Sequence, residues 1–183
     1  MNNPTEADAT SDFSEPFHPA CLPVDELLDQ CDIRRTRASG PGGQHRNKVE
    51  TAIEITHRPS GVQAMATERR SQEQNRQVAI GRLRLNLAVH VRTVSSDVVE
   101  ASLLWNSRCR SQRISCSEQH NDFPSLIAEA LNAVDAKSWD VKRAAAALGC
   151  STSQLVRFIS KSPDAFIYLN SQREAHGLKR LKP

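Results

Sequence analysis

Residues 37–48 read Arg-Ala-Ser-Gly-Pro-Gly-Gly-Gln-His-Arg-Asn-Lys, a glycine-rich loop that lies between two strand-like stretches of the chain. Three of the four residues from Gly40 to Gly43 are glycine, which adopts backbone angles closed to other residues and lets a backbone approach a partner closely. The loop fits neither common phosphate-binding motif. His45 replaces the third glycine of a dinucleotide fingerprint, and the Gly-Lys-Ser/Thr of a P-loop is missing.

The functional side chain at the tip of this loop is Gln44, an amide that donates and accepts hydrogen bonds but does not ionise. It cannot act as a nucleophile or a general base at neutral pH. It can position a water molecule, while a bare backbone N–H stabilises developing negative charge. The basic residues on both sides would hold such a tip against phosphates. We therefore expect the loop to enter the active site of a partner.

The sequence around the loop predicts a small antiparallel sheet. Ile33–Arg37 is a possible edge strand, and Val49–His57 alternates apolar and polar residues with the period of a half-buried strand. Residues 58–61, with a proline and a glycine, predict a turn, and Val62–Thr67 then forms the return strand of a hairpin.

Two patterns compete in the next segment, from Ser71 to about Val91. Leucine and valine at every second position from 83 to 91 suggest a strand, whereas Ile80, Leu83 and Leu87 form a helical stripe. Ser71 and Gln74 make a capping box, which with the length of the segment favours a helix.

The last 60 residues predict four short helices, with caps at Ser138, Ser151 and Ser162 and stops at Gly149 and Gly177. The expected fold class is α+β: a small sheet or hairpin domain with a long helix bearing the Gly-Gly-Gln loop, followed by a small all-α bundle that resembles a helix-turn-helix. We expect a disordered acidic leader over 1–22, a catalytic domain over 23–92, a linker with a short helix and a strand over 93–122, and the bundle over 123–183.

Charge is strongly segregated within an overall formal charge of +3. Residues 1–32 carry eight carboxylates and no Lys or Arg, whereas residues 33–92 carry twelve Lys or Arg and four carboxylates. Such a basic segment is typical of nucleic-acid binding, but a solvated surface balanced by the leader is equally compatible with the charge alone.

The composition also argues against several classes of protein. No apolar stretch is long enough to cross a bilayer, and the acidic leader lacks the positive charge of a secretory or mitochondrial signal, so we expect a cytoplasmic protein with no membrane partner. The five cysteines include no Cys-x-x-Cys pair, so we expect free thiols, no metal site and no cofactor. His57, like His45, is expected to be a polar surface residue, and Trp105 and Trp139 are expected to be packing anchors.

Residues 37–48 resemble the signature R-x-S-G-x-G-G-Q-H-x-N-K of the class I peptide chain release factors. The resemblance continues through the hairpin to Glu68-Arg69-Arg70-Ser71-Gln72-x-x-Asn75, and it covers roughly Asp25–Leu87. One departure is Arg46, where members of that family usually have a small apolar residue.

The resemblance implies hydrolysis of the ester that links a nascent peptide to tRNA, with the ribosome as partner and peptidyl-tRNA as substrate. Gly42 and Gly43 would shape the turn, the main-chain N–H of Gln44 would stabilise the transition state, and its side chain would admit water and exclude larger nucleophiles. The ribosomal RNA of the peptidyl-transferase centre supplies the rest of the site. Gln44 is then a candidate substrate for a glutamine methyltransferase.

Ten residues are candidates for RNA contact because their side chains are basic or polar and flank the loop or begin the basic helix. For the three on the helix, a solvated helix face is the alternative. The ten are Arg34, Arg35, Arg37, His45, Arg46, Asn47, Lys48, Arg69, Arg70 and Arg76.

Only 41 residues precede Gly42, too few for a codon-reading domain, so the chain resembles the short, codon-independent rescue branch of the family. It lacks the strongly basic tail typical of that branch. The alternative function is a nucleic-acid-binding regulator with an inactive loop. In that case Val141–Ile159 would be a DNA-reading helix-turn-helix, and Thr152, Ser153, Gln154 and Arg157 would face the groove.

Overall fold

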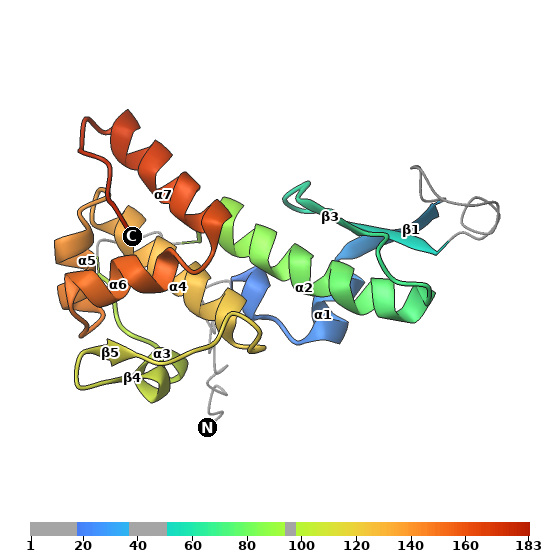
Figure 1. The fold of residues 1–183 in the computed structure, drawn as a ribbon, viewed down its shortest axis with the longest axis horizontal. Helices are drawn as coiled ribbons and strands as arrows, with labels where there is room; N and C mark the ends of the chain where they lie inside the picture. Colours follow the sequence, from blue (N-terminus) through green and yellow to red (C-terminus); the bar gives the residue numbers. More distant parts are fainter. Residues whose placement is uncertain (1–17, 37–50, 94–97) are drawn as a thin grey trace, which may run out of the picture.

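The computed structural model describes residues 18–36, 51–93 and 98–183. Figure 1 shows an elongated molecule with a small sheet at one end and the helices of the C-terminal third at the other. One long helix, α2 (Gln72–His90), runs between the two ends. A 3-10 turn (Pro19–Cys21) and the short helix α1 (Val24–Asp29) precede the sheet.

The sheet contains three antiparallel strands in the order β1 (Cys31–Thr36), β2 (Ala52–His57) and β3 (Gln63–Ala66). The alternation in β2 buries Ile53 and Ile55 against α2, and the alternate residues of β3 do the same. The predicted hairpin, its turn and the edge strand are therefore present. Residues 37–50 lie between β1 and β2 in the chain. The prediction that a long helix bears the Gly-Gly-Gln loop is therefore wrong, because the loop joins two strands of the sheet.

Helix α2 confirms the helical interpretation of the segment from Ser71 to Val91. The Ser71 side chain accepts a hydrogen bond from the Gln74 backbone N–H at 3.5 Å, as the capping box predicted. The sheet packs on one side of the helix, and the 3-10 turn, α4 and α7 contact it on others. Apolar residues on several sides of its C-terminal half are therefore buried or half-buried, which explains the strand-like alternation in its sequence.

The C-terminal part contains α3 and a two-stranded hairpin, followed by four helices with two of the three predicted caps. Ser151 and Ser162 cap their helices, but the predicted cap at Ser138 is wrong. Asp140 caps that helix instead, because Ser138 and Trp139 form a turn with positive φ that delays the helix start. The elements are α3 (Leu103–Arg108), β4 (Cys109–Arg110), β5 (Arg113–Ile114), α4 (Phe123–Ala136), α5 (Val141–Ala147), α6 (Thr152–Ile159) and α7 (Pro163–Ala175).

A single hydrophobic cluster runs from the sheet through α2 into the helical end. Trp105, from the predicted linker 93–122, is fully buried in it and donates a hydrogen bond from Nε1 to the Leu148 carbonyl at 2.8 Å. Trp139 is also buried, so both tryptophans are the packing anchors that the sequence predicted. All five cysteines are free thiols. None of the described helices is long and apolar enough to span a bilayer.

Residues 18–22, the end of the predicted leader, join this core, while residues 1–17 lie outside the described part of the chain. His18 Nδ1 accepts a hydrogen bond from the Ala20 N–H at 3.0 Å, and Nε2 lies 3.1 Å from the Val91 carbonyl. Because Nδ1 accepts, the proton sits on Nε2 and the ring is neutral. Burial lowers the pKa of His18 from 6.5 to about 4, although the bond to Val91 opposes this effect.

This pKa makes folding sensitive to acid. Between pH 6.5 and about pH 4 the unfolded chain binds a proton at His18 that the folded chain does not, so this contribution to stability is complete above pH 6.5 and is lost as the pH falls. We expect it to remove about 2 kcal/mol from the free energy of unfolding between pH 7 and pH 5. Urea denaturation of the wild type and of His18→Asn, which keeps an acceptor for Ala20 but does not titrate, measures it. Equal losses in both proteins would contradict the assignment.

Candidate functional site

The candidate catalytic loop begins and ends at one end of the sheet. Thr36, the last residue of β1, pairs with Ala52, the first residue of β2. Antiparallel partners lie roughly 5 Å apart, so the chain leaves and returns at almost the same point. The structure therefore describes the base from which the loop projects, which consists of β1, β2 and the start of α2; we call this base the platform. The loop residues predicted to act in catalysis or RNA contact lie outside the described residues; they are Arg37, Gly42, Gly43, Gln44, His45, Arg46, Asn47 and Lys48.

Asn75, in the first turns of α2, fixes the point at which the chain re-enters the sheet. Its side chain is fully buried, and Nδ2 donates to the carbonyl oxygens of Thr51 at 2.6 Å and of Arg69 at 3.0 Å. Its Oδ1 accepts a hydrogen bond from the Arg69 N–H at 2.9 Å. One amide thus joins the start of β2, the turn before α2 and α2 itself. Asn75 is part of the sequence motif that begins at Glu68, but the motif alone does not indicate this role.

The turn that leads into α2 is fixed by a second polar contact. The carboxylate of Glu68 accepts a hydrogen bond from the Thr67 N–H at 2.9 Å and forms an ion pair with Arg82 at 2.5 Å. The bonds to the backbone N–H groups of Thr67 and Glu68, and then Arg82, lower the pKa of Glu68 below its usual value. Arg82 also donates to the Met65 carbonyl at 2.8 Å, so the end of β3 is joined to the middle of α2.

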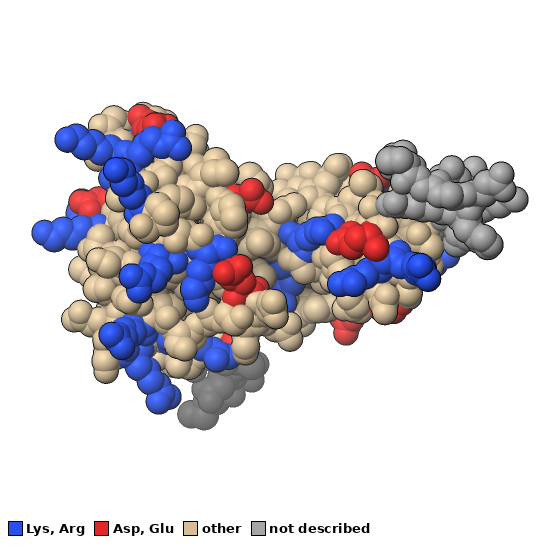
Figure 2. Space-filling model, in the orientation of Figure 1, with Lys and Arg blue, Asp and Glu red and all other residues tan. Residues whose placement is uncertain are grey.

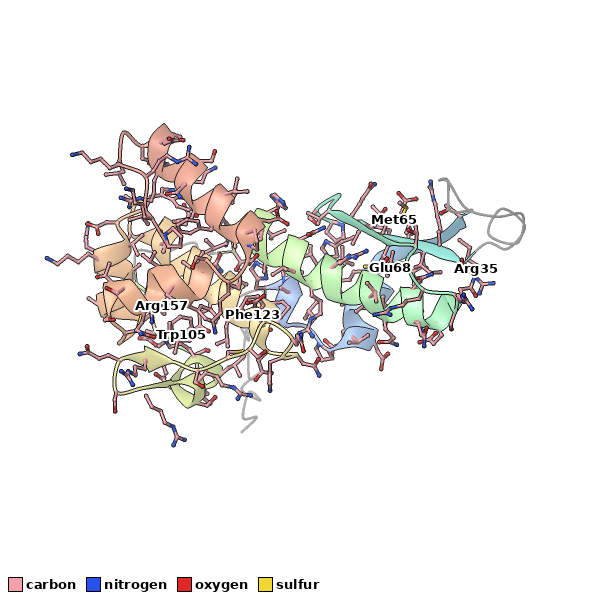
Figure 3. All side chains as sticks on the ribbon, in the orientation of Figure 1. Arg35, Met65, Glu68, Trp105, Phe123 and Arg157 are labelled. Carbon is pink, nitrogen blue, oxygen red and sulfur yellow. The ribbon has the colours of Figure 1, made fainter. Side chains whose placement is uncertain are left out.

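The structure places five of the predicted RNA-contact arginines near this platform. Arg34 and Arg35 are exposed on β1, close to where the chain enters residues 37–50, and Figure 3 shows Arg35 at that end of the molecule. Arg69 and Arg70 are exposed in the turn before α2, and the Asn75 hydrogen bonds hold Arg69 beside Thr51.

Arg76 is half-buried on α2 and lies 3.9 Å from Glu73. Other cations of the basic segment have structural partners within the fold. Arg84 donates to the Ala20 carbonyl, and Arg58 donates to the Cys31 carbonyl and forms an ion pair with Asp32 at 3.1 Å. The surface cations around the loop are therefore fewer than the sequence count suggests.

The prediction that His57 is a surface residue is wrong, because His57 is buried. Its Nδ1 lies 2.7 Å from the Ser60 hydroxyl, and its Nε2 lies 3.1 Å from Gln30 Oε1. Burial, and then the charge of Arg58, lower its pKa. His57 pairs with Cys31 at the end of the β1–β2 ladder opposite Thr36 and Ala52, so its role is to hold the turn.

Away from the loop, α5 and α6 are joined by a short turn in which Gly149 has a φ of +67°. On α6, Thr152, Ser153 and Arg157 are exposed, and Gln154 is half-buried. Three of the four residues predicted to face a DNA groove are thus exposed on one helix. Within the described residues, no three His, Cys, Asp or Glu side chains are grouped so that they could hold a metal ion.

The sequence model of the RF-1 domain matches residues 25–121, which is more than half of the chain. Three curated relatives are named as peptide chain release factors. The chloroplastic factor PrfB1 of Arabidopsis thaliana is 41% identical over 49% of this chain and 20% of its own length. Release factor 1 of Xylella fastidiosa is 40% identical over 60% of this chain and 28% of its own. Release factor 2 of Wolinella succinogenes is 36% identical over 57% of this chain and 30% of its own length.

The chain thus spans less than a third of the length of each of these relatives. The matched residues include the sheet, α2 and the whole of the loop, so the match covers the candidate site together with its platform. The chain therefore belongs to the class I peptide chain release factor family, whose RF-1 domain occupies residues 25–121.

Proposed function

We propose that this protein hydrolyses the ester bond of peptidyl-tRNA in the peptidyl-transferase centre of the ribosome, and that it does so without reading a codon. The observation that carries the proposal is the complete Arg37–Lys48 motif between two directly paired strands of an RF-1 domain. The exposed arginines near the base of the loop, Arg34, Arg35, Arg69 and Arg70, provide positive charge that can contact RNA phosphates.

The proposed chemistry uses little of the protein. The main-chain N–H of Gln44 stabilises negative charge on the tetrahedral transition state and on the departing ribose oxygen. The Gln44 side chain admits a water molecule and excludes larger nucleophiles, while Gly42 and Gly43 allow the backbone turn. Ribosomal RNA supplies the remainder of the site, so the proposed chemistry requires no catalytic triad or metal from the protein. Gln44 is also the proposed target of a glutamine methyltransferase.

The proposal also assigns roles to the parts of the chain. Residues 23–92 carry catalysis, residues 93–122 connect, and residues 123–183 form a helical module that holds the protein on its partner. Independence from the codon is a separate part of the proposal, and a direct test distinguishes it from hydrolysis.

That test compares peptide release from three kinds of ribosome: with an empty A site, with a stop codon in the A site, and with a sense codon. We expect release from the first kind, with no stimulation by the stop codon, and no hydrolysis of free peptidyl-tRNA. Stimulation by one or more stop codons would contradict codon independence while leaving the hydrolysis intact. No release from any of the three would contradict the whole proposal.

A second candidate function follows from the exposed polar surface of α6 next to the turn from α5. It is a nucleic-acid-binding regulator whose loop is inactive. It predicts binding to a specific DNA duplex that is lost when Arg157 and Gln154 are changed, and no sedimentation with 70S ribosomes. Sedimentation of the purified protein through a sucrose gradient with 70S particles separates the two functions.

A further inference from the structure

The C-terminal part of the chain has a basic surface that the proposed catalytic function does not use. Helix α3, the hairpin, α5 and α6 contain six Lys or Arg and no carboxylate, and one of the six, Arg108, forms an ion pair with Asp122 at 2.6 Å. Arg110 and Arg113 on the hairpin and Arg157 on α6 are exposed. Their side chains make no hydrogen bond or ion pair with other residues in 18–36, 51–93 or 98–183. We call these three arginines the hairpin–α6 surface.

The backbone beneath this surface is firmly held. β5 packs against α6, and the tip of the hairpin contacts the start of α6, where the Ser151 N–H donates to the Gln112 carbonyl at 3.4 Å. Trp105 anchors α3 in the core, and α3 leads directly into β4. In Figure 2, Lys and Arg atoms lie in several separate groups over this end of the molecule, and Figure 3 labels Arg157 there. The backbone that carries the three arginines is therefore held in place by packing and hydrogen bonds.

Two features of the hairpin oppose its stability. Arg110 and Arg113 are direct cross-strand partners, and like charges at such positions repel. The tip residues Ser111 and Gln112 have φ values of +47° and +62°, the left-handed angles of a two-residue hairpin turn, which cost a residue with a side chain more than they cost glycine. Features that break local rules in this way are expected where a site serves a ligand. An anion bound between the arginines would offset the repulsion.

We propose that the hairpin–α6 surface binds the phosphate backbone of structured RNA. Arginine forms bidentate hydrogen bonds with phosphate, and exposed hydroxyl and amide side chains add single contacts. Here such side chains flank the arginines: Ser111 and Gln112 at the hairpin tip, and Thr152 and Ser153 at the start of α6.

The same geometry argues against reading of DNA bases by α6. A recognition helix enters the major groove with its N-terminal residues foremost, and that groove admits one helix or one two-stranded ribbon. The hairpin tip lies beside the N-terminal end of α6, so it crowds the approach of that end to a groove. Contact with a backbone needs no such entry, and double-stranded RNA is recognised mainly by its shape and backbone.

The test measures binding by fluorescence anisotropy, with a labelled RNA stem-loop and a DNA duplex of the same length, at several KCl concentrations. The variant is R110Q/R113Q/R157Q. The matched control is K179Q/R180Q/K182Q, which removes the same charge from three exposed residues near the C-terminus. We expect the variant to bind RNA at least about tenfold more weakly, with a salt dependence reduced by about 2 in log–log slope, because each lost phosphate contact contributes about 0.7–0.9. The control should stay within about twofold of the wild type.

Equal weakening by the variant and the control would overturn the proposal, since binding would then depend only on net charge. Unchanged RNA binding by the variant would also overturn it, and so would tighter binding to the DNA duplex that depends on Arg157. Thermal unfolding checks the fold, and R110Q/R113Q, which removes the repelling pair, serves as a second variant with a smaller expected loss. These measurements involve no hydrolysis, so their outcome is independent of whether Gln44 acts in catalysis.

Discussion

Changing Gly43 to Ala is expected to slow peptide release from ribosomes with an empty A site by at least about 100-fold, the typical cost of losing one donor that stabilises an oxyanion. The reason is the backbone: in the proposed mechanism, a Cβ at position 43 would restrict the angles of the turn and would obstruct the close approach of the loop to RNA. The main-chain N–H of Gln44 would then no longer point at the developing charge. Single-turnover release of a labelled peptide measures the rate.

Gln44→Ala separates the roles of the backbone and the side chain. The main-chain N–H remains, so what is lost is the amide that, in the proposed mechanism, positions water and excludes larger nucleophiles. We expect release to water to fall severely and the transfer of the peptide to a small added nucleophile, such as hydroxylamine, to be relatively favoured over hydrolysis. An unchanged preference between the two would contradict the proposed role of the side chain.

Gly81→Ala provides a matched control for the glycine substitution. Gly81 lies within α2, and a Cβ there would meet no atom within 4 Å. Alanine at this position should leave release unchanged and stabilise the helix by up to about 1 kcal/mol. Both glycine variants should sediment with 70S ribosomes as the wild type does. If Gly43→Ala released peptide as fast as Gly81→Ala, the proposed mechanism would be wrong.

Asn75→Ala is expected to have the largest effect on stability, a loss of about 4 kcal/mol in the free energy of unfolding, because it leaves several buried polar groups unpaired. The Asn75 side chain makes hydrogen bonds with the Thr51 carbonyl and with both the carbonyl and the N–H of Arg69. Urea denaturation followed by circular dichroism measures the change. Local separation of β2 from α2 should also be visible as faster hydrogen exchange at the start of β2.

Two variants sharpen this prediction. Asn75→Asp keeps an acceptor for the Arg69 N–H but loses both donors, and it places a carboxylate against two carbonyl oxygens, so it should be as destabilising as alanine. Gln77→Ala removes a side chain of similar chemistry from the exposed face of the same helix, where it donates a hydrogen bond to Glu73 at 2.8 Å. It should cost less than about 0.5 kcal/mol. Similar losses for Gln77→Ala and Asn75→Ala would contradict the role of Asn75 as the joint between β2 and α2.

Much of the fold is encoded locally in this chain. The alternation in Val49–His57 and the turn at 58–61 predict the hairpin, and the capping box at Ser71 predicts where α2 begins. Ser138 shows the limit of such signals: it is a good capping residue by type, but the turn through Trp139 moves the cap to Asp140. Local patterns identify the elements because periodicity, capping and turn chemistry depend on residues a few positions apart.

For the candidate site too, some properties are determined by the sequence and others by the tertiary structure. The sequence alone determined the loop Arg37–Lys48, the family and the types of side chain available. Only the tertiary structure decided which of them remain free, because burial and pairing depend on residues far apart in the chain. The buried His57 ring lies within hydrogen-bond distance of Gln30. Arg82 forms an ion pair with Glu68, and Arg84 donates to the Ala20 carbonyl. Asn75 donates to the Thr51 carbonyl. A buried polar group must find a partner, and that partner is supplied by whichever segment the fold brings next to it.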